Sequence, residues 1–336
     1  MAKAVSVYRG TYVESTHDIH VAVANVDGNL LYSFGDSNRF TFPRSSMKPF
    51  QAIALMETGA ADEFQFEEAD LSVICSSHSG EPFHLKRVES ILHKIKLQED
   101  CLQCGTHIPR DIKNYNELIR AGGELSPKFS NCSGKHAGML AAVVYKGEDL
   151  KTYRELNHPH QQRILNAIEA VCDFKRDKLE ISVDGCGVPV HGLPLDRVAI
   201  GFSRLANPFS CAGFKHQNNL ERLRRAMVNY PELVAGTDRF DTDLMRVFKG
   251  RLVAKGGAEG VQCIGDTKTG VGIAIKVEDG NNRAATVAAM EVLLQLGICD
   301  EEQYSLLEHH ISAPVLNARN EKIGVIKPQF QLLQHN

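Results

Sequence analysis

The sequence has no excess of charge of either sign. Its 336 residues contain 38 Lys and Arg against 41 Asp and Glu, which gives a net charge of −3. Binding to nucleic acid or to an anionic membrane is usually driven by a cationic surface, and this composition does not provide one. Neither is therefore expected as a partner, and a small molecule fits the charge better.

Signals for export and for membrane insertion are also missing. The N-terminal stretch MAKAVSVYRGTYVES has no basic start followed by an apolar core, so no secretory signal is indicated. The most apolar stretch, Ala284 to Cys299, is interrupted by Glu291 and is shorter than the roughly 18 apolar residues that span a bilayer, so it predicts a core helix. The nine cysteines are odd in number and scattered, which favours reduced thiols in the cytoplasm.

No repeat, low-complexity segment or linker divides the chain, so we expect a single domain over residues 1–336. The segment at 20–34 alternates on both sides of Asp27-Gly28, as in an antiparallel hairpin. Near the other end, Val271–Val277 predicts a strand and Arg283–Leu296 a helix, while residues from about 80 to 175 are mostly helical. Outer strands around a helical centre favour an α/β protein with an antiparallel sheet flanked by helices.

Local patterns predict the elements that carry the polar motifs. Ser45–Gly59 is expected to be a helix capped by Ser45, and Leu71–Cys75 a short buried strand. Further helices are expected at Glu81–Ile95, Tyr115–Ala121, Cys132–Tyr145 and His160–Cys172.

The motif Ser45-Ser46-Met47-Lys48 is the first candidate for chemistry. Residues three apart on a helix share one face, so Lys48 could take the proton of Ser45 if its amine is uncharged. A capping serine followed by a surface lysine fits the same short pattern. The motif therefore needs support from other parts of the chain.

Two further polar segments offer that support. Ser76–Glu81 is a polar turn after the predicted strand and presents Ser77, although it could simply cap the next helix. AKGGAEG at 254–260 combines small residues, which let a ligand approach the backbone, with the positive charge of Lys255. Lys268-Thr269-Gly270 competes for that role, but its surroundings are typical of a turn.

Cysteines and histidines gather in NCSGKHAG at 131–138 and DGCGVPVH at 184–191. Spacing alone nominates four tetrahedral zinc ligands, Cys132, His136, Cys186 and His191. The same thiols could be small buried hydrophobic groups. The CxxC at 101–104 has no second CxxC beside it, so a zinc ribbon is not indicated.

Five ordered motifs together resemble the rhizobial-type L-asparaginases of the asparaginase II family, over nearly the whole chain. They are RSSMKPFQ at 44–51, SSHSGEP at 76–82, NCSGKHAGML at 131–140, DGCGVPV at 184–190 and AKGGAEG at 254–260. The resemblance implies a homodimer and a serine β-lactamase-like α/β/α sandwich. It also implies two serine–lysine tandems and a zinc site with a lysine in place of the histidines. These are Ser45 with Lys48, Ser77 with Lys255, and the ligands Cys132, Lys135 and Cys186.

The resemblance predicts hydrolysis of L-asparagine to L-aspartate and ammonia through a lysine-activated serine and an acyl-enzyme. Arg44 and Asp184 flank the motifs and are candidates for holding the substrate's α-carboxylate and α-ammonium, although ordinary turn or surface charges would also explain them. Crowding Lys48, Lys135, Lys255 and a metal together favours uncharged amines, so activity should rise toward alkaline pH.

Two other functions fit the same sequence motifs. A penicillin-recognising hydrolase (a β-lactamase) or esterase would share the serines and lysines, and a zinc-stabilised binding protein would use the serines only as caps. The preference for asparagine over glutamine stays open, because one methylene changes a pocket's preference by only about 1–3 kcal/mol. The attacking serine also stays open, and the tail Gln329–Asn336, beyond the recognisable portion, is expected to be variable or disordered.

Overall fold

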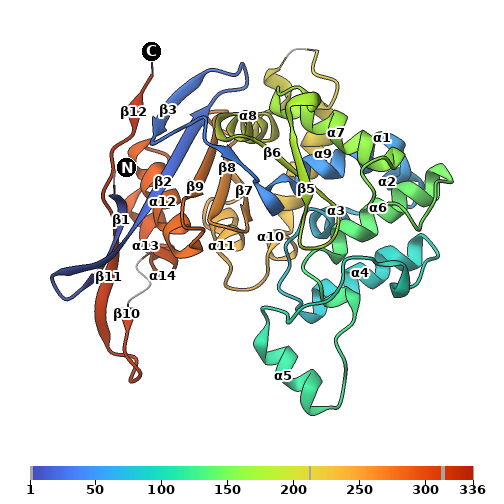
Figure 1. Cartoon of the computed structure of the whole chain (residues 1–336), viewed down its shortest axis with the longest axis horizontal. Coiled ribbons are helices and arrows are strands. Elements are labelled where there is room, and N and C mark those ends of the chain that lie inside the picture. The colour runs from blue at the N-terminus through green and yellow to red at the C-terminus, as the bar shows by residue number, and fades with distance from the viewer. Residues whose placement is uncertain (1–2, 212, 312–314, 336) are drawn as a thin grey trace. The chain divides into compact units, whose positions relative to one another are not determined.

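The chain of the computed structural model divides into two units, each built from segments far apart in sequence (Figure 1). The sheet unit comprises Met1–Ser46, Leu193–Ser210 and Asp243–Asn336, and the helical unit comprises Met47–Gly192 and Cys211–Thr242. Residues 3–211, 213–311 and 315–335 are described. The single domain expected over residues 1–336 stays a prediction.

An antiparallel sheet of nine described strands forms the sheet unit. Its order is β10-β11-β1-β2-β9-β8-β7, with β3 paired to both β2 and β12. The strands are β1 (Lys3–Arg9), β2 (Tyr12–Ala24), β3 (Leu30–Phe34), β7 (Leu252–Gly257), β8 (Val261–Asp266), β9 (Gly272–Val277), β10 (Val315–Leu316), β11 (Lys322–Pro328) and β12 (Leu333–Gln334). Strands from both ends of the chain therefore lie side by side.

Helices pack on this sheet, and two glycines bring one of them close. Helix α8 (Leu195–Ala206) contacts β8 and β9, where Gly265 and Gly272 face each other in register. A Cβ atom at Gly272 would lie 1.9 Å from the backbone oxygen of Ala199, so only glycine fits there. The other helices are α12 (Asn282–Gln295), α13 (Glu301–Leu306) and α14 (Glu308–Ile311), and α11 (Phe240–Val247) begins in the helical unit and continues into the sheet unit.

The helical unit is built around α1, which contacts α6, α7 and α9. Its helices are α1 (Lys48–Thr58), α2 (Ala60–Glu63), α3 (Glu68–Ile74), α4 (Pro82–Lys94), α5 (Ile112–Arg120), α6 (Ser133–Lys146), α7 (Pro159–Cys172), α9 (Gln217–Asn229) and α10 (Pro231–Val234). Strand β5 (Glu180–Val183) pairs with β6 (Pro189–Pro194), whose last two residues belong to the sheet unit and pair there with β4 (Phe40–Thr41). Within the described ranges, no helix is long and apolar enough to cross a membrane.

Helix α6 approaches α3 closely because of glycines at two of its positions. A Cβ atom at Gly134 would lie 2.1 Å from the backbone oxygen of Val73, and one at Gly138 would lie 2.7 Å from a methyl group of Ile74. The two glycines are four residues apart and so lie on the same face of α6. Their close contact brings the start of α6 next to the end of α3.

The predicted fold class is confirmed: the protein is a mixed α/β structure with an antiparallel sheet and many helices. The hairpin around Asp27-Gly28 is present as β2 and β3. The predicted strand Leu71–Cys75 is wrong, because Leu71–Ile74 belong to helix α3 and Cys75 is its C-cap. An apolar run this short does not distinguish a strand from a buried helix, and the capping box formed by Glu67 and Asp70 was the overlooked signal.

The start of one helix and the C-terminal tail also differ from the prediction. Helix α1 begins at Lys48, and Ser45 lies in a preceding 3₁₀ turn, Arg44–Met47, rather than at the helix cap. The tail expected to be disordered is ordered over its described part, because β12 pairs with β3 and the Gln329 backbone N–H donates to the Ala4 carbonyl at 2.7 Å. Strand pairing depends on partners distant in sequence, which local composition does not reveal.

Candidate active site

Lys48 and Ser77 meet in the interior of the helical unit. The Lys48 amine at the start of α1 lies 3.0 Å from the Ser77 hydroxyl oxygen. It also donates to the backbone oxygen of Ser76, and to that of Asn131 at 3.3 Å. Lys48 is 1% exposed and Ser77 8% exposed. The three oxygens match the three donors of a lysine ammonium, so the amine is held in one orientation.

The segment that carries Ser77 is held by the backbone of residues 230–235. The Ser77 backbone N–H donates to the Val234 carbonyl, and the Ser79 hydroxyl donates to the Ala235 carbonyl, both at 2.9 Å. In addition, the Glu81 carboxylate accepts from the Thr237 backbone N–H and hydroxyl. The turn around Ser77 is thus fixed by hydrogen bonds at both its ends.

Two stacked histidines, with ring centroids 5.0 Å apart, support the same turn. His78 Nδ1 accepts from the Gly80 backbone N–H, so its Nε2–H donates to the Ser133 hydroxyl at 2.8 Å. His84 Nδ1 accepts from the Glu81 backbone N–H, so its Nε2–H donates to the Glu232 carbonyl at 2.9 Å. Burial lowers the pKa of His84 to about 4 and that of His78 well below its usual range. Both rings therefore act as neutral spacers at neutral pH.

Cys132, Lys135 and Cys186 form a second buried group in the helical unit. The Lys135 amine lies 3.1 Å from the Cys186 sulfur, and all three side chains are buried. A hydrogen bond from Cys186 is the main cause that lowers the pKa of the Cys132 thiol far below its usual range, and the charges of Lys48 and Lys135 add to it. Burial disfavours the Lys135 ammonium, but attraction to Cys186 and Cys132 outweighs this and raises the pKa of Lys135.

The zinc ligands nominated by spacing do not come together. His136 Nδ1 lies 2.7 Å from the Tyr153 hydroxyl. Among the described residues, only one group of three or more His, Cys, Asp or Glu residues brings its ligand atoms within 4.8 Å of one another, and neither His136 nor His191 belongs to it. That group, Asp243, His309 and His310, could hold a metal ion. The only sequence signal for it was the His309-His310 pair, because Asp243 lies 66 residues away.

The remaining predicted residues divide between the two units. Ser45, Arg44 and Lys255 belong to the sheet unit. There, the Ser45 turn lies next to the end of β7, because a Cβ atom at Gly257 would be 2.2 Å from the Pro43 carbonyl, and Lys255 donates to the Gly256 carbonyl at 2.8 Å. Asp184 belongs to the helical unit, in the turn before Cys186, and its carboxylate accepts from the Gly185 N–H.

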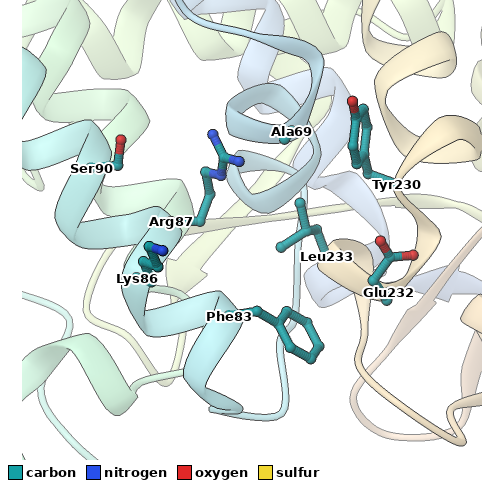
Figure 2. Close-up of a pocket in the computed structure, with 8 residues that line it drawn as sticks. All are labelled: Ala69, Phe83, Lys86, Arg87, Ser90, Tyr230, Glu232 and Leu233. Atoms are coloured by element: carbon teal, nitrogen blue, oxygen red, sulfur yellow. The ribbon is translucent and has the colours of Figure 1, made fainter.

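A pocket of about 480 Å³ in the helical unit has a different lining (Figure 2). Phe83, Tyr230 and Leu233 give it an apolar side, and Lys86 and Glu232 bring charges of both signs. No residue nominated from the sequence contributes to its described lining. Sequence reasoning missed this pocket because its walls come from α4 and from a segment about 150 residues later.

Comparison with known proteins agrees with the five motifs. The sequence pattern of the L-asparaginase II family matches residues 5–328. No curated protein sequence matches the chain. A protein from Bacteroides dorei DSM 17855, provisionally named a beta-lactamase, is similar in structure over 77% of this chain and 84% of its own, with 12% identity and a TM-score of 0.39.

The protein Mglu, solved in its native form in the presence of 4.3 M NaCl, is similar over 85% of this chain and 63% of its own, with 13% identity and a TM-score of 0.39. This chain thus spans less than two thirds of Mglu. Both structural likenesses are distant, whereas the family pattern covers nearly the whole sequence. The chain belongs to the L-asparaginase II family.

Proposed function

We propose that the protein hydrolyses L-asparagine to L-aspartate and ammonia, using a serine activated by Lys48. The family assignment supports the activity, and one contact supports the chemistry: the Lys48 amine lies 3.0 Å from the Ser77 hydroxyl oxygen in a buried setting. A proton can pass directly between two groups at that distance. No carboxylate or imidazole is needed for this step.

In the proposed reaction the uncharged amine of Lys48 takes a serine proton as the serine oxygen attacks the side-chain amide carbon. The same proton then passes to the leaving nitrogen, which departs as ammonia and leaves an acyl-enzyme. Water hydrolyses the ester and releases aspartate. Ser77 is the hydroxyl that contacts Lys48. The family resemblance implies the tandems Ser45 with Lys48 and Ser77 with Lys255, so Ser45 and Lys255 are proposed as the other serine and lysine of the site.

Ser45→Ala and Ser77→Ala identify the attacking oxygen. The variant that lacks this oxygen should form no covalent acyl-enzyme in rapid-quench mass spectrometry. The variant that lacks only the relaying hydroxyl should form the acyl-enzyme more slowly. If neither substitution reduced ammonia release, the serine mechanism would be ruled out.

The substrate assay also tests the competing functions. Ammonia release should be measured with L-asparagine and L-glutamine, and ring opening with the β-lactam nitrocefin. We expect release from asparagine. Nitrocefin hydrolysis without ammonia release would indicate a penicillin-recognising enzyme, and retained metal without either reaction would indicate a binding protein.

The residues Cys132, Lys135 and Cys186 fit the zinc ion that the family resemblance implies. Two buried sulfurs and a buried amine are soft or borderline donors, which zinc prefers over magnesium or calcium. Lys135 must lose its proton before its nitrogen can bind. When bound, zinc would add positive charge to this group and hold the turn at Cys186 to the start of α6.

Substituting Cys186→Ser should remove one of the two proposed thiolate ligands and leave that of Cys132. In the cobalt-loaded protein this should lower the near-ultraviolet absorption from thiolate–cobalt bonds by about half per bound cobalt, because one such bond is left. Cys172→Ser is the matched control, because Cys172 is equally buried but lies in α7 outside this group. Unchanged absorption in Cys186→Ser would remove Cys186 from the proposed ligands.

Arg44 and Asp184 are proposed to hold the substrate's α-carboxylate and α-ammonium. Arg44 has a φ of +57°, which costs a non-glycine residue roughly 1–2 kcal/mol. Such strain at a residue next to a proposed catalytic serine is consistent with a functional role.

Arg44→Ala and Arg44→Gly form a matched pair. Both should raise KM for asparagine roughly tenfold or more, since a charged hydrogen bond is worth about 1.5–3 kcal/mol. Only the alanine variant keeps the strained φ, so urea unfolding should show the glycine variant to be about 1 kcal/mol more stable. A wild-type KM in both variants would exclude Arg44 as a substrate anchor.

We also propose that the protein is a homodimer, as the family resemblance implies. Light scattering should then give a mass of twice the chain's 37.1 kDa. A mass equal to that of one chain at all concentrations tested would contradict it.

A further inference from the structure

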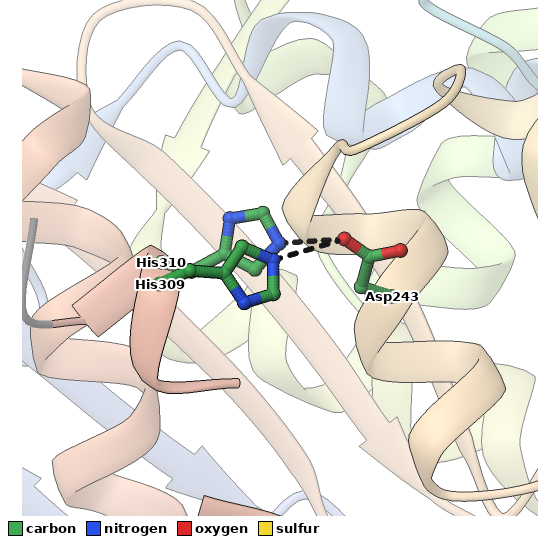
Figure 3. A group of neighbouring side chains, drawn as sticks. All are labelled: Asp243, His309 and His310. Carbon is green, nitrogen blue, oxygen red and sulfur yellow. Dashed lines mark hydrogen bonds and ion pairs between the residues drawn. The ribbon is translucent and has the colours of Figure 1, made fainter. Parts of the chain in front are cut away.

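Two consecutive histidines direct their rings at one carboxylate in the sheet unit (Figure 3). His310 Nε2 lies 2.8 Å from Asp243 Oδ2, and His309 Nε2 lies 3.4 Å from the same oxygen. Successive residues of a helix normally point about 100° apart, so convergence of both nitrogens on one atom is unusual. All three ligand atoms lie within 4.8 Å of one another.

The backbone that carries this pair is anchored on both sides. Leu307 and Ile311 flank the two histidines and are buried. The Thr286 hydroxyl on α12 donates to the His310 carbonyl at 3.1 Å. The two rings are therefore presented to Asp243 from an anchored backbone.

The chemistry of the donors selects the kind of ligand. Two imidazole nitrogens and one carboxylate oxygen suit zinc, cobalt, nickel or copper, whereas calcium and magnesium prefer oxygen ligands alone. Sites with three protein ligands of this kind complete a zinc coordination sphere with water. The His309 side chain is 57% exposed, so an ion can enter from solvent.

We propose that Asp243, His309 and His310 bind a divalent transition metal, zinc or one with the same ligand preference. The site uses none of Cys132, Lys135 and Cys186 and contains no thiolate. Its ion links α14 to α11, elements 66 residues apart in sequence, so metal binding stabilises the folded sheet unit.

Cobalt binding to the metal-free full chain tests this proposal, because cobalt bound only by nitrogen and oxygen shows weak visible bands without thiolate absorption. We expect each chain to bind one cobalt ion that shows only these weak visible bands. Adding zinc should raise the melting temperature. In His309→Gln, the affinity for this cobalt ion should fall by more than roughly 10–100-fold. That is the usual loss when a residue that only hydrogen-bonds a metal ligand is replaced. Asp243→Asn and His310→Gln should have the same effect.

His93→Gln is the matched control, since His93 is an exposed histidine at the end of α4. It should bind cobalt and respond to zinc like the wild type. His310 and Asp243 are partly buried, so their variants could lose stability directly, but the exposed His309 avoids this difficulty. The proposal is overturned if His309→Gln binds cobalt as tightly as wild type, or if the wild type binds cobalt only with thiolate absorption.

Discussion

Replacing Lys48 with methionine is expected to lower kcat for asparagine hydrolysis by roughly 10²- to 10⁴-fold, the usual contribution of a positioned general base. Methionine has a similar length and fills the same buried space, but it cannot accept or return a proton. It also leaves the oxygens of Ser76, Ser77 and Asn131 without the donor that they now share. The measurement is ammonia release at saturating substrate, with circular dichroism to confirm folding.

Three buried oxygens that lose their shared hydrogen-bond donor could destabilise the variant, so a smaller change is needed beside it. Ser77→Ala removes only the hydroxyl that contacts Lys48, and should lower kcat by a similar factor. Ser203→Ala is its matched control: the Ser203 hydroxyl, on α8 of the sheet unit, is also buried and donates to a backbone carbonyl, that of Gly270. A fully active, folded Ser77→Ala would refute the proposed role of the Lys48–Ser77 contact.

The pairing of Lys48 with Ser77 could not have been derived from spacing. The S-x-x-K argument assigns Ser45 to Lys48 only if one α-helix contains both, and α1 begins at Lys48. The observed partner is 29 residues away, in the turn that follows α3. That position depends on how α3 and α6 pack, which is a tertiary property.

The sequence does carry one signal for this packing. The glycines of NCSGKHAG were interpreted as part of a metal motif, but Gly134 is also required where α6 approaches the Val73 carbonyl. One motif thus sets both the helix contact and the position of Cys132 and Lys135. The motifs nominated the candidate residues, whereas the contacts between those residues required coordinates.

The Asp243, His309 and His310 group could not be predicted from the sequence at all. A pair of adjacent histidines is easy to recognise in a sequence, but consecutive side chains of a helix normally point about 100° apart. Only the anchored backbone and the carboxylate from α11 make them converge. No local pattern encodes a contact across 66 residues.

The free energy of unfolding is expected to fall steeply as pH is lowered from about 7.5 to 5. Burial lowers the pKa of His160 to about 3, and burial is also the main cause that lowers the pKa values of His84 and His191 to about 4. The unfolded chain binds these protons near pH 6.5, so it gains them before the folded chain does. Stability is therefore complete above pH 6.5 and decreases as pH falls toward these lower values, by about 2 kcal/mol per histidine at pH 5.

His160→Leu isolates one of these contributions. Neither ring nitrogen of His160 has a hydrogen-bond partner among the described residues, so leucine removes the proton uptake without breaking a polar contact. Urea unfolding at about pH 7.5 and 5 should show the difference between the two conditions shrinking by about 2 kcal/mol, whatever the constant offset from repacking. His93→Gln should leave the difference unchanged because His93 is exposed. A pH dependence identical to wild type in His160→Leu would mean that His160 is already charged, or solvated, in the folded protein.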